Sequence, residues 1–365
     1  MGAGRCGKVP RGISRLLLCL LTLACVSSGQ SSSPPSPSPA PASPQEPQSA
    51  QPQATQPQAT QPQATQPQAT APQEDDSGGF VFKKEVEEVV LHAIVVDDQN
   101  RLVTGLARDN FKVYEDNKLQ ELTSFRKERV PVALGILIDN SGSMLPKRAK
   151  VNEAALQLVD ASQQEDRVFV VNFSENAFLD QDYTPDVGKL RAAIERVETR
   201  GSTALYDALI AAVDHLNQTS PLQKKVLLVV TDGRDNASQA TFEEVLRKLQ
   251  SKNGPVLYTI ALELNEDKEK RGRRDDGDRQ SLRRLSEQTG GTAFFPSSLD
   301  EIQSIASAIA RDIRSQYVIG YRSSNSHTVG TYHSIQVQAL DGATRMRVTT
   351  RTGYYSGKTG SNESQ

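Results

Sequence analysis

The chain has 365 residues, enough for one large domain or two of modest size. Its formal net charge of −2 provides no bulk field that would favour nucleic acid or an anionic membrane. The lack of tryptophan and the low aromatic content argue against a base-stacking surface. All three cysteines lie within the first 25 residues, so the rest of the chain has neither disulfides nor thiol chemistry. The four histidines are scattered without HExxH spacing, which favours ordinary surface or core positions over a zinc site.

Residues 1–29 are predicted to be a signal peptide. A basic start is followed by the apolar run Leu16–Val26, which is too short to span a bilayer stably, and then by small residues suited to cleavage. We therefore expect an exported protein, either secreted or held in the periplasm or cell envelope. An alternative is a lipid anchor at Cys25, although the preceding residues Thr22 to Ala24 fit a bacterial lipobox poorly.

Residues 30–78 form a low-complexity segment rich in proline, serine and glutamine. The unit QPQAT repeats in register from Gln51 to Thr70. Proline at every fifth position excludes a helix interior and a central strand, and nothing apolar is available to bury. The composition predicts a disordered linker, and we expect the tail 357–365 to be disordered as well.

Short strands are predicted at both ends of the remaining chain. In residues 79–130 the apolar pattern and the turn residues predict strands at 88–96, 111–115 and 119–125. In residues 316–356 the same signals predict strands at 316–321, 332–340 and 344–350. Because three or four strands make a poor core alone, we expect the two ends to pair into one small β-sandwich domain. The intervening domain would then be inserted between them.

Residues 131–315 alternate strands and helices, the pattern of an α/β domain. Predicted strands are 132–138, 167–173, 226–230, 256–261 and 292–295, with 178–183 as a short antiparallel edge strand. Predicted helices are 145–163, 187–197, 204–217, 241–252, 279–289 and 299–314. The fold class expected for this segment is a doubly wound, mostly parallel sheet with helices on both faces, similar to a Rossmann fold.

Polar residues lie in three predicted loops: after the strand 132–138, before the helix 204–217 and after the strand 226–230. Asp139, Ser141 and Ser143 follow the apolar strand that begins at Val132, and Ser143 could serve as the N-cap of the next helix. Thr203 precedes the helix at 204, and Asp232 follows the strand VLLVV. Right-handed crossovers place the carboxyl ends of parallel strands on one side of the sheet, so these five residues can converge.

The five side chains offer only oxygen ligands: two carboxylates and three hydroxyls. Such a set selects Mg²⁺, with Mn²⁺ or Ca²⁺ as possible substitutes. An octahedral Mg²⁺ would keep an open position for water or for a carboxylate from a partner. The alternative is that all five residues simply cap helices, which is the common role of isolated residues of these types.

The segments DNSGSM, GSTALYDAL and VTDG resemble the three parts of the metal-ion-dependent adhesion site (MIDAS) of von Willebrand factor type A domains. The resemblance covers about residues 131–315. It implies that Ser141, Ser143 and Thr203 bind the metal directly and that Asp139 and Asp232 bind it directly or through water. Met144 is assigned to packing. The flanks, including VTGLARDNFKVYEDNKLQELTSF and RSQYVIGY, resemble a bacterial group of exported type A-related proteins best known from acidobacteria.

The resulting hypothesis is a non-enzymatic protein that binds a partner through its metal, the partner supplying an acidic residue. A structural scaffold of the envelope with a vestigial site is an alternative. A phosphatase that uses Asp139 as nucleophile would need a second aspartate where this chain has Ser141. Neither GxxxxGK[ST] nor GxGxxG occurs, so the sequence gives no support for nucleotide binding.

Overall fold

The computed structural model describes residues 88–127, 130–196, 199–220, 222–232, 235–262, 273–325 and 328–357. All of them belong to one compact unit, Gly79–Gln365. The predicted signal peptide, the linker, Cys25 and the tail after Gly357 lie outside the described residues. Within the part of the chain that is described, no helix is both long enough and apolar enough to cross a membrane.

The unit contains a six-stranded sheet in the order β10-β9-β8-β5-β6-β7. All neighbouring pairs are parallel except β7, which lies antiparallel to β6 at the edge. The strands are β5 (Val132–Asp139), β6 (Arg167–Phe173), β7 (Ala177–Thr184), β8 (Lys224–Thr231), β9 (Val256–Ala261) and β10 (Ala293–Phe294). The predicted α/β class and the antiparallel edge strand are therefore both present.

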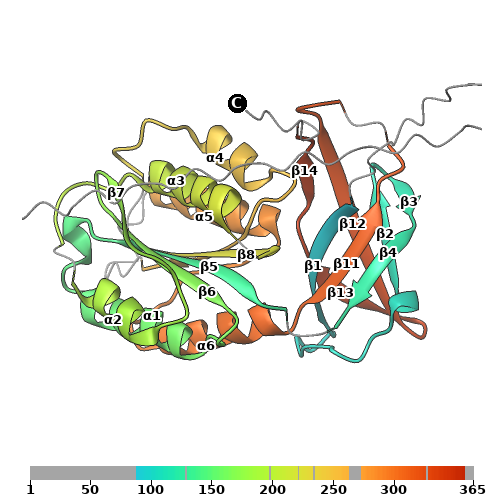
Figure 1. The fold of residues 1–365 in the computed structure, drawn as a ribbon, viewed down its shortest axis with the longest axis horizontal. Helices are drawn as coiled ribbons and strands as arrows, with labels where there is room; N and C mark the ends of the chain where they lie inside the picture. Colours follow the sequence, from blue (N-terminus) through green and yellow to red (C-terminus); the bar gives the residue numbers. More distant parts are fainter. Residues whose placement is uncertain are drawn as a thin grey trace, which may run out of the picture. The chain divides into compact units, whose positions relative to one another are not determined.

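Helices cover both faces of this sheet (Figure 1). One face carries α1 (Arg148–Asp160), α2 (Val187–Glu195) and α6 (Glu301–Arg314). The other carries α3 (Leu205–Thr219), α4 (Phe242–Leu249) and α5 (Arg273–Thr289). The glycine pair predicted to end a helix does so: α5 stops at Thr289, and Gly290 adopts the left-handed conformation with φ of 87°.

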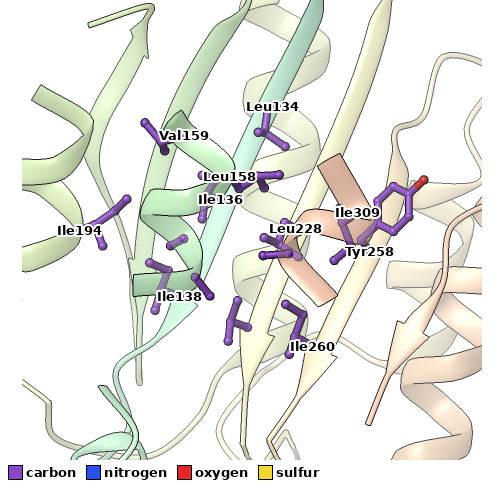
Figure 2. Close-up of a cluster of buried hydrophobic side chains, with 14 of the residues drawn as sticks. Leu134, Ile136, Ile138, Leu158, Val159, Ile194, Leu228, Tyr258, Ile260 and Ile309 are labelled. Atoms are coloured by element: carbon purple, nitrogen blue, oxygen red, sulfur yellow. The ribbon is translucent and has the colours of Figure 1, made fainter. Parts of the chain in front are cut away.

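Strand β5 is buried along its whole length because both of its faces are covered. Leu134, Ile136 and Ile138 pack beneath α1, α2 and α6, as Figure 2 shows, whereas Ala133 and Leu137 pack under α3 to α5. Gly135 lies on the second face, where a Cβ atom would stand 2.3 Å from Cζ of Phe169. The continuous apolar run in the sequence thus corresponds to a strand with two buried faces.

The position of β5 between β8 and β6 places its carboxyl end where ligands can bind. The chain leaves β5 for β6 on one side and later enters β8 on the other side. The carboxyl end of β5 is therefore the topological switch point, where ligands bind in open α/β sheets.

The remaining strands form one eight-stranded sheet in the order β3-β2-β12-β13-β1-β11-β4, with β14 paired to β12. They are β1 (Glu88–Val96), β2 (Phe111–Glu115), β3 (Lys118–Gln120), β4 (Leu122–Arg126), β11 (Tyr317–Arg322), β12 (Tyr332–Asp341), β13 (Thr344–Thr349) and β14 (Gly353–Tyr355). A short 3-10 helix, η1 (Arg108–Asn110), precedes β2. Strands from before and after the α/β segment pair with each other in this sheet: β1 pairs with β11 and β13, β2 pairs with β12, and β4 pairs with β11.

This arrangement differs from the predicted β-sandwich in two respects. The strands join into a single antiparallel sheet instead of two packed sheets, and its core is a cluster that includes Leu91, Val113 and Ile319. The strand predicted at 119–125 is interrupted at Glu121, giving β3 and β4 with different partners. The β2–β3 turn places Asp116 and Asn117 at positive φ, as a tight hairpin turn requires.

Candidate metal site

The candidate site lies at the carboxyl end of β5. Asp139 is the last residue of this strand, and Gly142–Met144 form a 3-10 turn, η2, before α1 begins. The predicted N-cap role of Ser143 is wrong, because Lys147 is the N-cap of α1. Met144 is fully buried in the core beneath α1, as its assignment to packing required.

Asp139 is completely buried and held from two sides. Its Oδ1 accepts a hydrogen bond of 2.8 Å from the backbone N–H of Ser141, and its Oδ2 accepts one of 2.6 Å from the hydroxyl of Thr231. Burial raises the pKa of Asp139, and the nearby charge of Asp232 adds to this effect, against the hydrogen bonds from Thr231 and Ser141. A cation at this position would relieve the unfavourable burial of the carboxylate.

The side chains of Ser141, Ser143 and Asp232 form a chain of contacts across the site. The hydroxyl oxygens of Ser141 and Ser143 are 3.1 Å apart, and the Ser143 hydroxyl donates to Oδ1 of Asp232 at 2.8 Å. The Nζ of Lys147 forms an ion pair with Oδ2 of Asp232. A positive charge therefore already contacts one of the two candidate carboxylates.

The loop that carries Thr203 is fixed beside this turn by backbone contacts. The N–H of Gly142 donates to the carbonyl of Gly201 at 3.1 Å, and Gly201 has a φ of 84°, a conformation that favours glycine. The N–H of Thr203 donates to Oδ1 of Asn236 at 2.8 Å. Thr203 is buried, but it makes no direct hydrogen bond to the other four candidate residues.

Helix capping does not account for these residues. The N-cap of α3 is Ala204 and not Thr203, and the N-cap of α4 is Thr241 and not Asp232. Thr241 makes a complete capping box with Glu244. Helix α1, which follows Asp139, Ser141 and Ser143, also begins without a hydrogen bond from either serine side chain. The alternative that these residues cap helices therefore has no support at the starts of α1, α3 and α4.

Three residues that the sequence reasoning did not select also shape the site. Thr231 holds Asp139, as described above. Arg148, buried below the turn, donates to Oδ1 of Asn172 at 3.2 Å, and burial lowers its pKa to about 10 against the opposing effect of Asp139. Both polar atoms of the Asn140 side chain are buried and have no hydrogen-bond partner within the described part of the chain. Asn140 lies within the DNSGS segment, but its residue type alone did not distinguish it from an ordinary turn residue.

The candidate residues are compatible with a hard divalent cation. Adjacent ligands of an octahedral Mg²⁺ with bonds of about 2.0–2.1 Å lie roughly 2.9 Å apart. The spacings of 3.1 Å between the two serine oxygens and 2.8 Å between Ser143 and Asp232 match this value. The donors are all oxygens, and the ammonium of Lys147 shows that a cation can be accommodated at Asp232.

A second cluster of ionisable groups, Glu115, Asp116 and His333, lies in the antiparallel sheet. Glu115 is fully buried, and its carboxylate accepts hydrogen bonds from Tyr321 at 2.6 Å, from Asn325 at 2.9 Å and from other neighbours. Nδ1 of His333 lies 2.8 Å from Oδ2 of Asp116. Because the lone pairs of Glu115 are used by protein donors, this cluster is better explained as a structural network that joins the strands.

Comparison with known protein families identifies the family of the α/β segment. The sequence model described as von Willebrand factor type A domain matches residues 134–234. The chain contains a von Willebrand factor type A domain. The match includes the end of β5, the loop with Thr203 and the end of β8, so the type A domain contributes all five candidate residues.

Relatives of this type A domain occur in larger proteins. Calcium-activated chloride channel regulator 3A-1 from Mus musculus is 29% identical over 188 residues, which cover 48% of this chain and 18% of that protein. The chain therefore spans less than a fifth of the length of this relative.

Solved structures of similar fold include a von Willebrand factor type A protein from Catenulispora acidiphila, with 13% identity, 76% of both chains covered and a TM-score of 0.43. Another is proximal thread matrix protein 1 from the mussel byssus with a zinc-occupied MIDAS motif. It shares 19% identity, with 56% of this chain and 50% of that chain covered and a TM-score of 0.42.

Proposed function

We propose that this protein is an exported, non-enzymatic binding protein whose type A domain captures a protein partner through a divalent cation. The cation would be held by Asp139, Ser141, Ser143, Thr203 and Asp232. The observation that carries the proposal is a chain of contacts at the switch point of the sheet. The backbone N–H of Ser141 donates to Asp139, and the hydroxyls of Ser141 and Ser143 lead from there to Asp232. Five oxygen donors favour Mg²⁺, with Mn²⁺ and Ca²⁺ as substitutes.

The partner is expected to contribute a carboxylate. Two aspartates balance a dication, while the three hydroxyls stabilise it without adding charge, so the bound ion remains able to attract an anionic ligand. Ser143 is exposed, which leaves the outer side of the site accessible to a partner. A carboxylate from the partner would fill the position that an octahedral ion keeps open.

Lys147 is expected to oppose metal binding. Its ammonium contacts Asp232, whose side chain is fully inaccessible to solvent, and like charges repel more strongly where water is excluded. A divalent cation would have to displace this contact. Replacing Lys147 by methionine should therefore strengthen Mg²⁺ binding, whereas replacing the more exposed Lys150 in the same way should not.

Export is proposed from the basic and apolar composition of residues 1–29, with the linker 30–78 separating the binding domain from the signal. The location would be the extracellular space, the periplasm or the cell envelope. A lipid anchor at Cys25 is the alternative mode of attachment. The flanking segments support placement with the exported type A-related proteins of acidobacterial type.

Affinity capture tests the proposal. The full chain is immobilised and exposed to an envelope extract in Mg²⁺, in EDTA, and in EDTA followed by excess Mg²⁺. We expect the same captured proteins in the first and third conditions, and their loss in EDTA and with Asp139→Asn. Asp98→Asn, which removes an exposed carboxylate in the turn after β1, is the matched control. Capture that is independent of metal and of Asp139 would favour a structural scaffold with a vestigial site.

A further inference from the structure

A cavity of about 400 Å³ lies at the junction of the two sheets, far from the candidate metal site. Its wall includes the first half of β1, the starts of β8 and β9, and the loop between α4 and β9. Lys225 is at the amino end of β8 and Thr231, which holds Asp139, is at its carboxyl end. Thr231 is six positions further along the strand, or about 20 Å, so the cavity and the metal site lie at opposite ends of the strands of this sheet.

The charged groups that line the cavity are mainly cationic. They are Lys225, Lys252 and Arg351, and among the described residues that line the cavity the only carboxylate is that of Glu88. Glu88 already accepts hydrogen bonds from the hydroxyls of Thr123 and Ser124. The cavity therefore carries an excess of positive charge.

Two of these cations have no acidic partner among the described residues. Lys225 Nζ donates to the neutral amide of Asn217 at 2.9 Å, and burial lowers the pKa of Lys225. Arg351 is buried and donates to the backbone carbonyls of Ser251 at 2.9 Å and Lys252 at 2.6 Å. Neutral acceptors satisfy hydrogen bonds but leave both charges uncompensated, which favours a bound anion.

His92 adds a neutral polar group to the same wall. Its Nδ1 is buried and has no hydrogen-bond partner among the described residues. Burial, together with the charges of Lys224 and Arg351, lowers the pKa of His92 to about 3, so the ring is neutral at physiological pH. A neutral imidazole keeps one N–H donor that can contact an oxyanion. A buried polar atom without a partner is unfavourable unless water or a ligand contacts it.

We propose that this cavity binds a small organic acid through its carboxylate or phosphate group, which would contact Lys225, Arg351 and His92. The volume falls within the range of small-molecule sites, about 300–1,000 Å³. Val90 and Val256 provide apolar wall for the carbon skeleton of such a molecule. Because Glu88, Val90 and His92 belong to β1 and Lys225 belongs to β8, the ligand would bridge the two sheets and stabilise their junction.

Binding is measured on the full chain in EDTA, so that the metal site contributes nothing and the result is independent of the proposed function. Inorganic phosphate, glycerol 3-phosphate and succinate are titrated at constant ionic strength by calorimetry and by thermal melting. We expect saturable binding of at least one and a rise in melting temperature with its concentration. The preferred probe identifies whether the natural ligand carries phosphate or carboxylate.

Two variants assign the binding to the cavity. Lys225→Met should weaken binding about tenfold or more, because a charge-assisted hydrogen bond is lost. His92→Phe should also weaken binding, because it removes the imidazole N–H donor that β1 provides. Lys189→Met, which removes an exposed lysine on α2, is the matched control and should bind like wild type. The absence of saturable binding by all three probes, or equal affinities of Lys225→Met and Lys189→Met, would overturn the proposal.

Discussion

Replacing Tyr321 by phenylalanine should lower the stability of the antiparallel sheet, because it removes a hydrogen bond to a buried carboxylate. The Tyr321 hydroxyl on β11 donates to the buried carboxylate of Glu115 on β2 at 2.6 Å. Tyr354 on β14 donates to the same oxygen at 3.2 Å. The carboxylate thus joins a strand from before the type A domain to strands from after it.

A hydrogen bond to a charged group contributes about 1.5–3 kcal/mol, and the loss is at the upper end when the charge stays buried. For a unit of this size, 1 kcal/mol lowers the melting temperature by roughly 2–4 °C. With a loss of about 3 kcal/mol, we therefore expect Tyr321→Phe to melt about 6–12 °C below wild type when followed by circular dichroism. Tyr114→Phe is the control, because this hydroxyl on β2 makes no hydrogen bond among the described residues. Equal melting of the two variants would refute the assignment of Glu115 as the link between the strands.

Three further predictions concern segments and pH. A chain without residues 1–78 should remain folded, since the removed segment has no core-forming residues, and a large loss of thermal stability would show that it packs on the domain. Residues 131–315 alone should melt below residues 80–356, because β1 and β11 pair across the ends of the inserted segment; equal melting temperatures would contradict this. Burial would raise the pKa of Asp166, but hydrogen bonds from Arg314, Gln163 and Val132 outweigh it and lower the pKa from 3.8. Asp166→Asn should therefore be less stable at neutral pH. The difference should shrink as pH falls below about 4 and through the lowered pKa, because wild type then loses the same interaction. A constant difference down to pH 2, measured by urea unfolding, would argue against this role.

Much of the α/β segment could be predicted because its signals are local. The apolar run from Val132 ends at a strand terminus, and Gly290 ends α5, so the strand pattern and one helix end follow from short stretches of sequence. Asp139, Ser141, Ser143 and Asp232 were brought together by a general rule of parallel sheets. The helix start was misplaced because Ser143 belongs to the 3-10 turn η2, and α1 begins only at Arg148.

What could not be predicted depends on contacts between distant parts of the chain. The contact of His333 with Asp116 joins residues 217 positions apart, and no local pattern indicates it. The single sheet, in place of a sandwich, depends on β1 pairing with β11 over one part and β13 over the other, which hydrophobic alternation does not specify. The ion pair of Lys147 with Asp232 depends on the path of the turn between β5 and α1.

Calorimetric titration of Mg²⁺ into the full chain tests the central claim most directly. We expect saturable binding at one site per chain and a melting temperature that rises with Mg²⁺ concentration. The expected stabilisation is about 2.7 kcal/mol when free Mg²⁺ is a hundredfold above its dissociation constant. Asp139→Asn should abolish both effects, Lys147→Met should strengthen them, and Asp98→Asn should leave them unchanged. A wild-type melting curve that does not respond to Mg²⁺, or an undiminished response in Asp139→Asn, would contradict the assignment of these residues as a metal site.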